Sequence, residues 1–160
     1  VYSGFTFVLG FALVFRTSQS YSRYWIAATS VHKMRSEWFD ACASLVAFAQ
    51  LSKKSSERIN AFEHTMIRLF CLLHAMSLEE IATLVNEDFP LLDIEGFNSL
   101  DLKVLTTPNA QGRKVEIVFQ WIKVYIIQSM QEGLLNVPPP ILTRVFQELG
   151  SGLVYFHEAL

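Results

Sequence analysis

Four histidines are the residues of this chain best suited to holding a metal ion or transferring a proton. A metal site in a helical bundle takes ligands from one helix face, often through a Glu-x-x-His motif or two histidines four residues apart. Neither spacing joins the histidines at His32, His64, His74 and His157. We therefore expect isolated surface or core histidines, with no bound metal and no cofactor.

Nucleophilic chemistry and phosphate binding have little support either. Cys42 and Cys71 lack the CxxC spacing of redox and zinc sites and lie in apolar helical surroundings, so we expect two buried free thiols. The sequence Gly150-Ser151-Gly152 follows a predicted helix and lacks the third glycine of a phosphate-binding loop. No serine or cysteine lies beside a plausible base, so the sequence does not indicate an enzyme.

An aromatic row near the start of the chain favours a different function. Ser3, Phe7 and Phe11 follow one another at intervals of four, which places them one above another on a helix, and Phe15 continues the row. Such a row is typical of an ordinary core stripe. If several copies of the helix surround an axis, it instead forms a narrow hydrophobic collar that can gate by dewetting. Phenylalanine edges carry partial positive charge, so edges turned inward disfavour cations more than anions.

A triple proline followed by Ile141 is the second feature of this kind. Proline is tolerated in the first turn of a helix, so Pro138 to Pro140 predict a helix start. The first N–H groups of a helix are unpaired within it and lie at the positive end of its dipole. The motif therefore predicts either an ordinary helix start or, beside an aqueous cavity, a weak anion site without a formal charge.

The helix that must carry the aromatic row begins at Val1. Residues 1–15 are apolar apart from Ser3 and Thr6, whereas a membrane span needs roughly 20 such residues, so we expect an incomplete span in a fragment with residues missing upstream. A basic flank and an interfacial aromatic belt follow it, formed by Arg16, Arg23, Lys33 and Arg35 and by Tyr21, Tyr24 and Trp25. Since no proline or glycine interrupts residues 17–50, the helix is expected to continue out of the membrane.

Three further helices are predicted after a polar break at residues 51–56. One carries an apolar seam at steps of three and four, formed by Ile59, Phe62, Met66, Leu69, Leu73 and Met76. The next covers residues 115–135, where the length of the pattern favours helix over strand. The last has one face formed by Ile141, Val145, Leu149, Gly152 and Phe156, and its Gly150 and Gly152 indicate a kink or close packing against another backbone.

An acidic segment separates the first and second of these three helices. Residues 79–101 contain seven acids and no base, and Pro90 and Gly96 interrupt any regular structure. We expect a solvated loop here, with a cation site or an acidic docking surface as the alternative.

Composition narrows the class of protein. At 160 residues the chain is long enough for a single domain with a core. Its residues are 51% hydrophobic and 18% charged, against about a quarter charged in ordinary soluble domains, which favours contact with a membrane. The net charge of -2 argues against a nucleic-acid partner.

Two long motifs resemble those of one known family. The segments FTFVLGF (residues 5–11) and FRTSQSYSRYW (residues 15–25) resemble the second membrane helix of the bestrophins. The segment GLLNVPPPILTRVFQEL (residues 133–149) is similar to a later, proline-initiated helix of the bacterial and plant branch, and RLFCLLHA (residues 68–75) matches more loosely. The motifs lie in order across nearly the whole chain.

The resemblance implies an all-α subunit of a pentameric anion channel. It assigns Ser3, Phe7 and Phe11 to a three-ring hydrophobic neck and Ile141 to the inner aperture. It also implies one domain over residues 1–160, with residues 1–25 as membrane span and interface and residues 26–160 mainly as intracellular helices, the last returning toward the pore. The implied partners are small anions such as chloride, the lipid membrane and further copies of the chain. The membrane, plasma or organellar, for example thylakoid, is left open.

The chain departs from the family pattern at several positions. Ser3 is polar where an aliphatic residue is usual, and Ser18 and Tyr24 replace asparagine and tryptophan. Ile26 and Ala28 stand where glutamate and arginine are usual, so a salt-bridge network at the base of the span is expected to be absent. The acidic segment does not match the calcium site of animal members, and calcium gating is not carried over.

The leading interpretation is therefore a channel for passive anion flux. A non-conducting, membrane-associated helical scaffold that binds partners through the seam of residues 59–76 is the alternative. A soluble helical enzyme is a third interpretation and requires a bound metal or cofactor.

Overall fold

The described part of the chain consists of four long helices and a short helical turn at residues 103–105, and it contains no strand. The computed structural model describes residues 2–82, 103–105, 107 and 112–160, with side chains of the first helix described from Gly4 onward. The helices are α1 (Tyr2–Gln50), α2 (Ser56–Ile81), α4 (Lys114–Gln131) and α5 (Pro139–Ala159). The predicted all-α class is confirmed for these residues.

Helix α1 runs without a break from the apolar segment into the bundle. Beyond Gly10 it contains neither proline nor glycine, so nothing in its sequence interrupts the helical hydrogen bonds over its 49 residues. It ends at Gln50, ahead of the polar residues 51–55, and α2 begins after Ser55, which has an extended backbone. The predicted unbroken helix over residues 17–50 and the break after it are confirmed, whereas its exit from a membrane stays a prediction.

The end of α4 differs from the prediction. The helix stops at Gln131, before the expected end at Leu135, because Gly133 adopts a left-handed φ of 72°. The N–H groups of Leu134 and Gly133 donate to the carbonyl oxygens of Ser129 and Met130, which is the Schellman arrangement that closes a helix end. The glycine, and not the later prolines, therefore ends α4.

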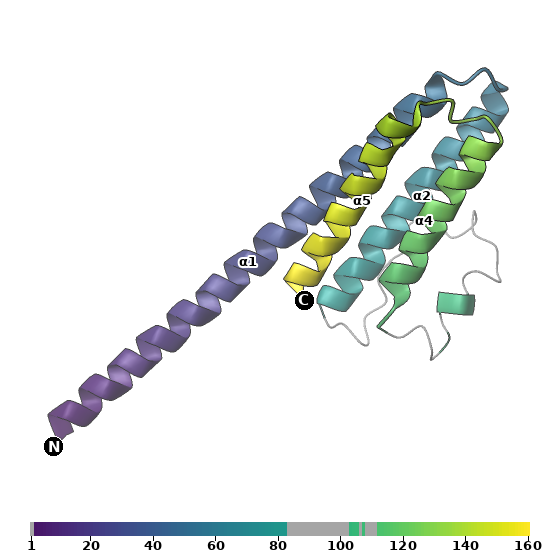
Figure 1. Cartoon of the computed structure of the whole chain (residues 1–160). Coiled ribbons are helices and arrows are strands. Elements are labelled where there is room, and N and C mark those ends of the chain that lie inside the picture. Colours follow the sequence, from purple (N-terminus) through teal and green to yellow (C-terminus); the bar gives the residue numbers. More distant parts are fainter. Residues whose placement is uncertain (1, 83–102, 106, 108–111) are drawn as a thin grey trace.

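The bundle is formed by the C-terminal half of α1 together with α2, α4 and α5 (Figure 1). Helix α5 lies along α1, and α2 contacts both α1 and α4. The seam of α2 is confirmed, since Ile59 is partly buried and the other five predicted residues are buried: Phe62, Met66, Leu69, Leu73 and Met76. The largest enclosed core side chains from the other helices include Met34, Leu45, Ile122, Ile126, Leu149 and Phe156.

Trp38 joins α1 to α5. Its indole Nε1 donates to the carbonyl oxygen of Leu149 at 3.2 Å, and the side chain is only 3% exposed. Gly152 packs against the same indole so closely that an added Cβ would clash with it, whereas Gly150 has open space around it. The predicted close packing is therefore found at Gly152, against a side chain and not a backbone.

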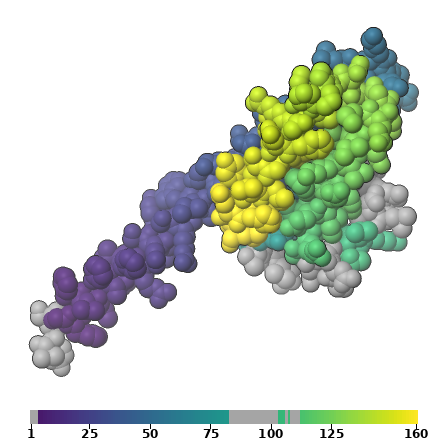
Figure 2. All heavy atoms as spheres, in the orientation of Figure 1, coloured from purple at the N-terminus to yellow at the C-terminus, as the bar shows by residue number. Residues whose placement is uncertain are grey.

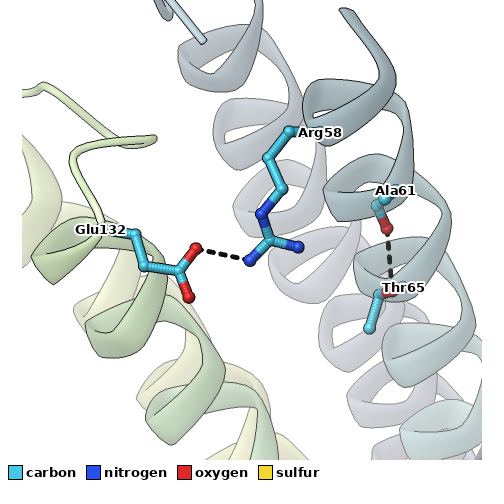
Figure 3. A network of polar contacts seen from close by, with 4 residues as sticks. All are labelled: Arg58, Ala61, Thr65 and Glu132. Atoms are coloured by element: carbon cyan, nitrogen blue, oxygen red, sulfur yellow. Dashed lines mark hydrogen bonds and ion pairs between the residues drawn. The ribbon is translucent and has the colours of Figure 1, made fainter. Parts of the chain in front are cut away.

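Polar contacts close the α2–α4 pair at both ends. Arg58 of α2 and Glu132, just beyond α4, form an ion pair at 2.5 Å (Figure 3). At the other end Lys114 Nζ lies 2.9 Å from Glu79 Oε1. Between them the Phe62 and Tyr125 rings stack with centroids 5.5 Å apart. These contacts show that α2 and α4 are antiparallel.

Two predictions about the surface need correction. Cys71 is exposed, and Cys42 is half-buried, so only the prediction of free thiols is met and that of two buried thiols is wrong. The acidic segment begins inside α2, where Glu79 and Glu80 are helical and half-buried, and is therefore not all loop. Its remaining acids, at residues 87–101, lie outside the described residues.

Candidate functional site

The N-terminal half of α1 makes no buried contact with the rest of the chain. Every described side chain from Gly4 to Ile26 is exposed, and the first buried residue of the helix is Ser30. Figure 2 shows this half projecting from the bundle as a free arm. A row of apolar side chains that the described residues leave uncovered is typical of a surface that contacts a partner or a membrane.

The predicted neck residues lie on this free arm. Phe7 is 76% and Phe11 67% exposed, and the Phe11 and Phe15 rings are stacked with centroids 6.3 Å apart. Ser3 belongs to α1, but its side chain lies outside the described residues. The core-stripe interpretation of the row therefore does not apply within the single chain, and the neck assignment stays a prediction.

The row points away from the bundle. Eighteen residues make about five turns of an α-helix, so Phe7, Trp25 and Ala43 lie on one line along α1. Ala43 is exposed, whereas Met34 and Leu45, about half a turn around the helix from that line, are buried in the core. Phe7 therefore lies on the same side of α1 as the residues that face away from the bundle.

An aromatic cluster marks the point where the free arm meets the bundle. The Tyr21 and Trp25 rings make an edge contact at 6.1 Å, and Tyr24 contacts Trp25 at 6.3 Å. Thr17 Oγ1 donates to the carbonyl oxygen of Leu13 at 2.8 Å, so this polar side chain is satisfied by its own helix. Such amphipathic rings are typical of a membrane–water interface.

Ile141 lies in the first turn of α5 and is 48% exposed, unlike the rest of the face predicted for it. Val145, Leu149, Gly152 and Phe156 are buried as predicted, and Leu142 takes the buried place in the first turn. The predicted prolines do start the helix, with Pro139 as its first residue.

The predicted unpaired N–H groups are not found at this helix start. Prolines 138 to 140 have no N–H, and the N–H groups of Ile141 and Leu142 donate to the Pro138 carbonyl oxygen at 3.0 and 3.4 Å. The prediction of a weak anion site made of backbone donors is therefore wrong for these residues. This first turn of α5 instead exposes the apolar side chain of Ile141 to solvent.

The chain does not bring the two sets of predicted residues together. Helix α5 is antiparallel to α1, because Ser30 Oγ donates to Glu158 Oε2 at 3.3 Å and Trp38 contacts Leu149. This register sets Ile141 level with about residue 47 of α1, roughly 54 Å along the axis from Phe11. The neck and aperture candidates thus lie near opposite ends of the molecule.

No group of ligands for a metal occurs among the residues that the structure describes. His74 is half-buried, and burial lowers the pKa of its imidazole, with Arg35 adding to the effect. Its Nε2 is enclosed without a hydrogen-bond partner. Its environment therefore favours the neutral imidazole over the protonated one.

Trp38 is a positioning residue that sequence reasoning missed. Through Leu149 and Gly152 it fixes α5 against α1, and so fixes the position of Ile141 relative to the free arm. The glycine at position 152 was the available signal, because glycine inside a helix indicates a close neighbour.

The fold and the site define an all-helical protein that carries an aromatic, apolar helix beyond its own bundle. A protein-family model described as "Bestrophin, RFP-TM, chloride channel" matches residues 3–152, which is nearly the whole chain. The chain therefore belongs to the bestrophin family. No curated protein and no solved structure matches it.

The matched region includes all four candidate residues, from Ser3 to Ile141, and the family is one of channels and not of enzymes. Over the described residues, none of the helices combines the length and the hydrophobicity needed to cross a bilayer.

Proposed function

We propose that the protein is an anion channel subunit, integral to a membrane, that gives passive flux of chloride or similar small anions. Family membership supports the class, and the exposed row of Phe7 and Phe11 on the free arm of α1 is the observation that carries the mechanism. No step of catalysis is involved, because a pore lowers the barrier to passage without changing its solute.

The mechanism requires several copies of the chain. One helix cannot enclose water, and the free arm has no partner within its own bundle. The resemblance implies five copies, whose arms would surround one axis with Phe7 and Phe11 turned toward it. The outward direction of this row, away from α2 and α5, supports such an arrangement because the bundles then lie outside the axis.

Charge favours anions over cations in this arrangement. The first 36 residues carry four bases and no acid, at Arg16, Arg23, Lys33 and Arg35. Repeated around an axis, they create a positive potential below the neck that raises the local anion concentration. Phenylalanine edges add a weak preference of the same sign.

The aperture follows at the far end of the bundle. Ile141 would form a second apolar constriction, about 54 Å from Phe11 by the register of α1 and α5. In this proposal residues 1–25 form the membrane part and its interface, and residues 26–160 surround the inner cavity. Ser3 would form the outermost and most polar ring of the neck.

Flux measurements in liposomes test the neck. Phe7→Ala and Phe11→Ala remove ring bulk from the constriction, and a barrier lowered by about 1.4 kcal/mol raises the rate about tenfold. Phe5→Ala is the matched control, because Phe5 is 68% exposed on the same arm but lies on nearly the opposite side of the helix from Phe7. We expect raised chloride flux in the first two variants and unchanged flux in the control.

Equal flux in wild type and all three variants would remove the neck assignment. An increase in Phe5→Ala as large as in Phe7→Ala would show instead that the arm is loosened as a whole. At the aperture, Ile141→Ala has its own matched control in Val154→Ala, since Val154 is 57% exposed on another face of α5. Only the former is expected to change flux.

The alternative, a scaffold that binds partners through the seam of α2, is disfavoured because that seam is not available for binding. Phe62, Met66 and Leu73 of that seam are fully enclosed in the chain's own core. A stable monomer in detergent would nevertheless exclude the channel, because the pore requires neighbouring copies.

A further inference from the structure

A polar groove lies on the surface of the bundle where α5 runs along α1. Its charged lining residues are Glu37 and Asp40 of α1 and Arg144 and Glu148 of α5. Arg144 Nε lies 2.9 Å from Glu148 Oε1, so the base of the groove is already paired within the chain. Three acids against one base leave this acidic groove negative.

The acidic groove is open to a partner. Asp40 is exposed, and the Phe39 ring at the rim of the groove is 73% exposed. The second oxygen of the Glu148 carboxylate, Oε2, is enclosed without a hydrogen-bond partner. Arginine and aromatic side chains are enriched at protein–protein interfaces. The groove therefore suits a partner surface that brings a base together with apolar side chains.

The opposite flank of α1 has that character. Arg35 is exposed and forms no ion pair with any residue that the structure describes. Its charge acts instead on His74 of α2, a group that cannot neutralise it. Cys42 and Val46 continue the same flank at seven and eleven residues after Arg35, and both are half-buried. This basic flank, formed by Arg35, Cys42 and Val46, contains no acid.

The acidic groove and the basic flank lie on either side of the row that contains Phe7. Ala43 marks the direction of this row within the bundle. At about 100° per residue, Arg35 lies about 80° to one side of Ala43 and Asp40 about 60° to the other. In a closed ring of identical copies, each interface joins one flank of a copy to the opposite flank of the next. With Phe7 toward the axis, the two surfaces of neighbouring copies therefore face each other.

The two surfaces also lie at the same height. A rotation that closes a ring produces no shift along its axis. Arg35 lies two residues before Glu37 and five before Asp40, which is about 3 Å and 7.5 Å along α1. Where α1 runs along the ring axis, an extended arginine side chain can span this difference.

We propose that the acidic groove of each copy binds Arg35 of the next copy and thereby holds the ring together below the neck. The guanidinium would form charge-assisted hydrogen bonds with the carboxylates of Glu37 and Asp40, beside the exposed Phe39 ring. The inference rests on the proposed assembly around Phe7, but not on conduction. The proposed pore is incomplete without such a contact, because one arm cannot enclose water.

The test is the mass of the full-length protein in detergent, measured by light scattering over a dilution series. Arg35→Glu or Asp40→Arg alone places like charges at every interface. Each should raise the protein concentration at which half of the assembly dissociates by at least about tenfold. The double variant restores opposite charges and should return to within about threefold of wild type.

Lys53→Glu and Glu57→Arg are the matched controls. They make the same charge changes at exposed positions near the α1–α2 connection, away from the groove, and should leave the assembly unaltered. Circular dichroism of each variant checks that it is folded.

The outcomes separate this contact from the proposed function. A wild-type protein that is monomeric at every concentration would remove both. A wild-type assembly that Arg35→Glu and Asp40→Arg leave unchanged would refute the contact alone. Single variants that weaken assembly without recovery in the double variant would also refute it, because the loss then does not come from pairing between the two residues.

Discussion

The two halves of α1 are one uninterrupted helix with opposite surroundings. From Tyr2 to Ile26 no described side chain is buried, whereas from Ser30 to Gln50 every turn contributes to a core. Both halves are rich in apolar residues, and neither contains a proline, so α1 is helical throughout. The covered half therefore finds its packing partners within the chain, whereas the described residues provide none for the bare half.

The bare half of α1 also differs in charge from the bundle that the covered half joins. The first 31 residues carry no acid and no histidine, whereas the bundle holds ion pairs between Arg58 and Glu132 and between Lys114 and Glu79. The bare half therefore has the apolar, basic surface without acids that the proposed anion pore requires. The bundle, in contrast, has the mixed charges of a water-exposed surface.

The largest expected contrast between the halves concerns their tryptophans. Trp38→Ala removes a buried indole and its hydrogen bond to Leu149, which should lower the free energy of unfolding by about 3–5 kcal/mol. Trp25→Ala changes an exposed ring and should stay within about 0.5 kcal/mol. Denaturant unfolding of the full chain in detergent, followed by circular dichroism, measures both. Equal losses would contradict the division of α1 into a covered and a bare half.

A second contrast lies within α5, where it meets the covered half. Gly152→Ala forces a methyl group into the Trp38 indole and should cost about 1–3 kcal/mol of stability. Gly150→Ala is the matched control, because its Cβ meets nothing and the helix gains about 0.5–1 kcal/mol. If thermal unfolding places both variants on the same side of wild type, the close contact at Trp38 is not present in solution.

The ion pair at the far end of the bundle should contribute less. The Arg58 and Glu132 side chains are 43% and 50% exposed, so their coupling is expected to lie below about 1 kcal/mol. A double-mutant cycle with Arg58→Ala and Glu132→Ala measures it. The coupling should fall further in 1 M salt, and a large, salt-independent value would show that the pair is more buried than described.

A pH-dependent contrast completes the series. The lowered pKa of His74 means that the unfolded chain binds a proton that the folded chain resists, so stability should fall as pH drops below the ordinary value of 6.5. Burial and Glu116 raise the pKa of Glu80, so its contribution falls as pH rises above 4.5 and has the opposite sign. His74→Gln should remove the loss between pH 7 and pH 5, measured by thermal unfolding. A variant as sensitive to pH as wild type would refute the assignment.

The periodic features of the bundle could be predicted from the sequence. The seam of α2, the long α1, the helix that starts near residue 115 and the proline start of α5 all follow from local spacing and turn chemistry. The spacing of residues along a helix shows which of them share a face. An apolar face is expected to be buried in the core, as is found for Phe62 and Met66.

Features that depend on neighbours in space could not be predicted. Cys71 has apolar neighbours in sequence yet is exposed, because burial depends on which helices pack around α2. Ile141 belongs by spacing to a buried face, but its place at the first turn lifts it out of the core. The missing backbone donors at α5, in contrast, could have been predicted, because the three prolines of the sequence have no N–H. The proposed neck and aperture depend on how several copies of the chain assemble, and that arrangement cannot be derived from the sequence of one chain.

The most direct test of the central claim is a density map of the full-length protein assembled in a membrane mimetic. The account predicts several copies, with the Phe7 and Phe11 side chains of every copy directed at one shared axis and the bundles arranged outside it. Phe7 and Phe11 directed at lipid, or at the interior of a single copy, would contradict it.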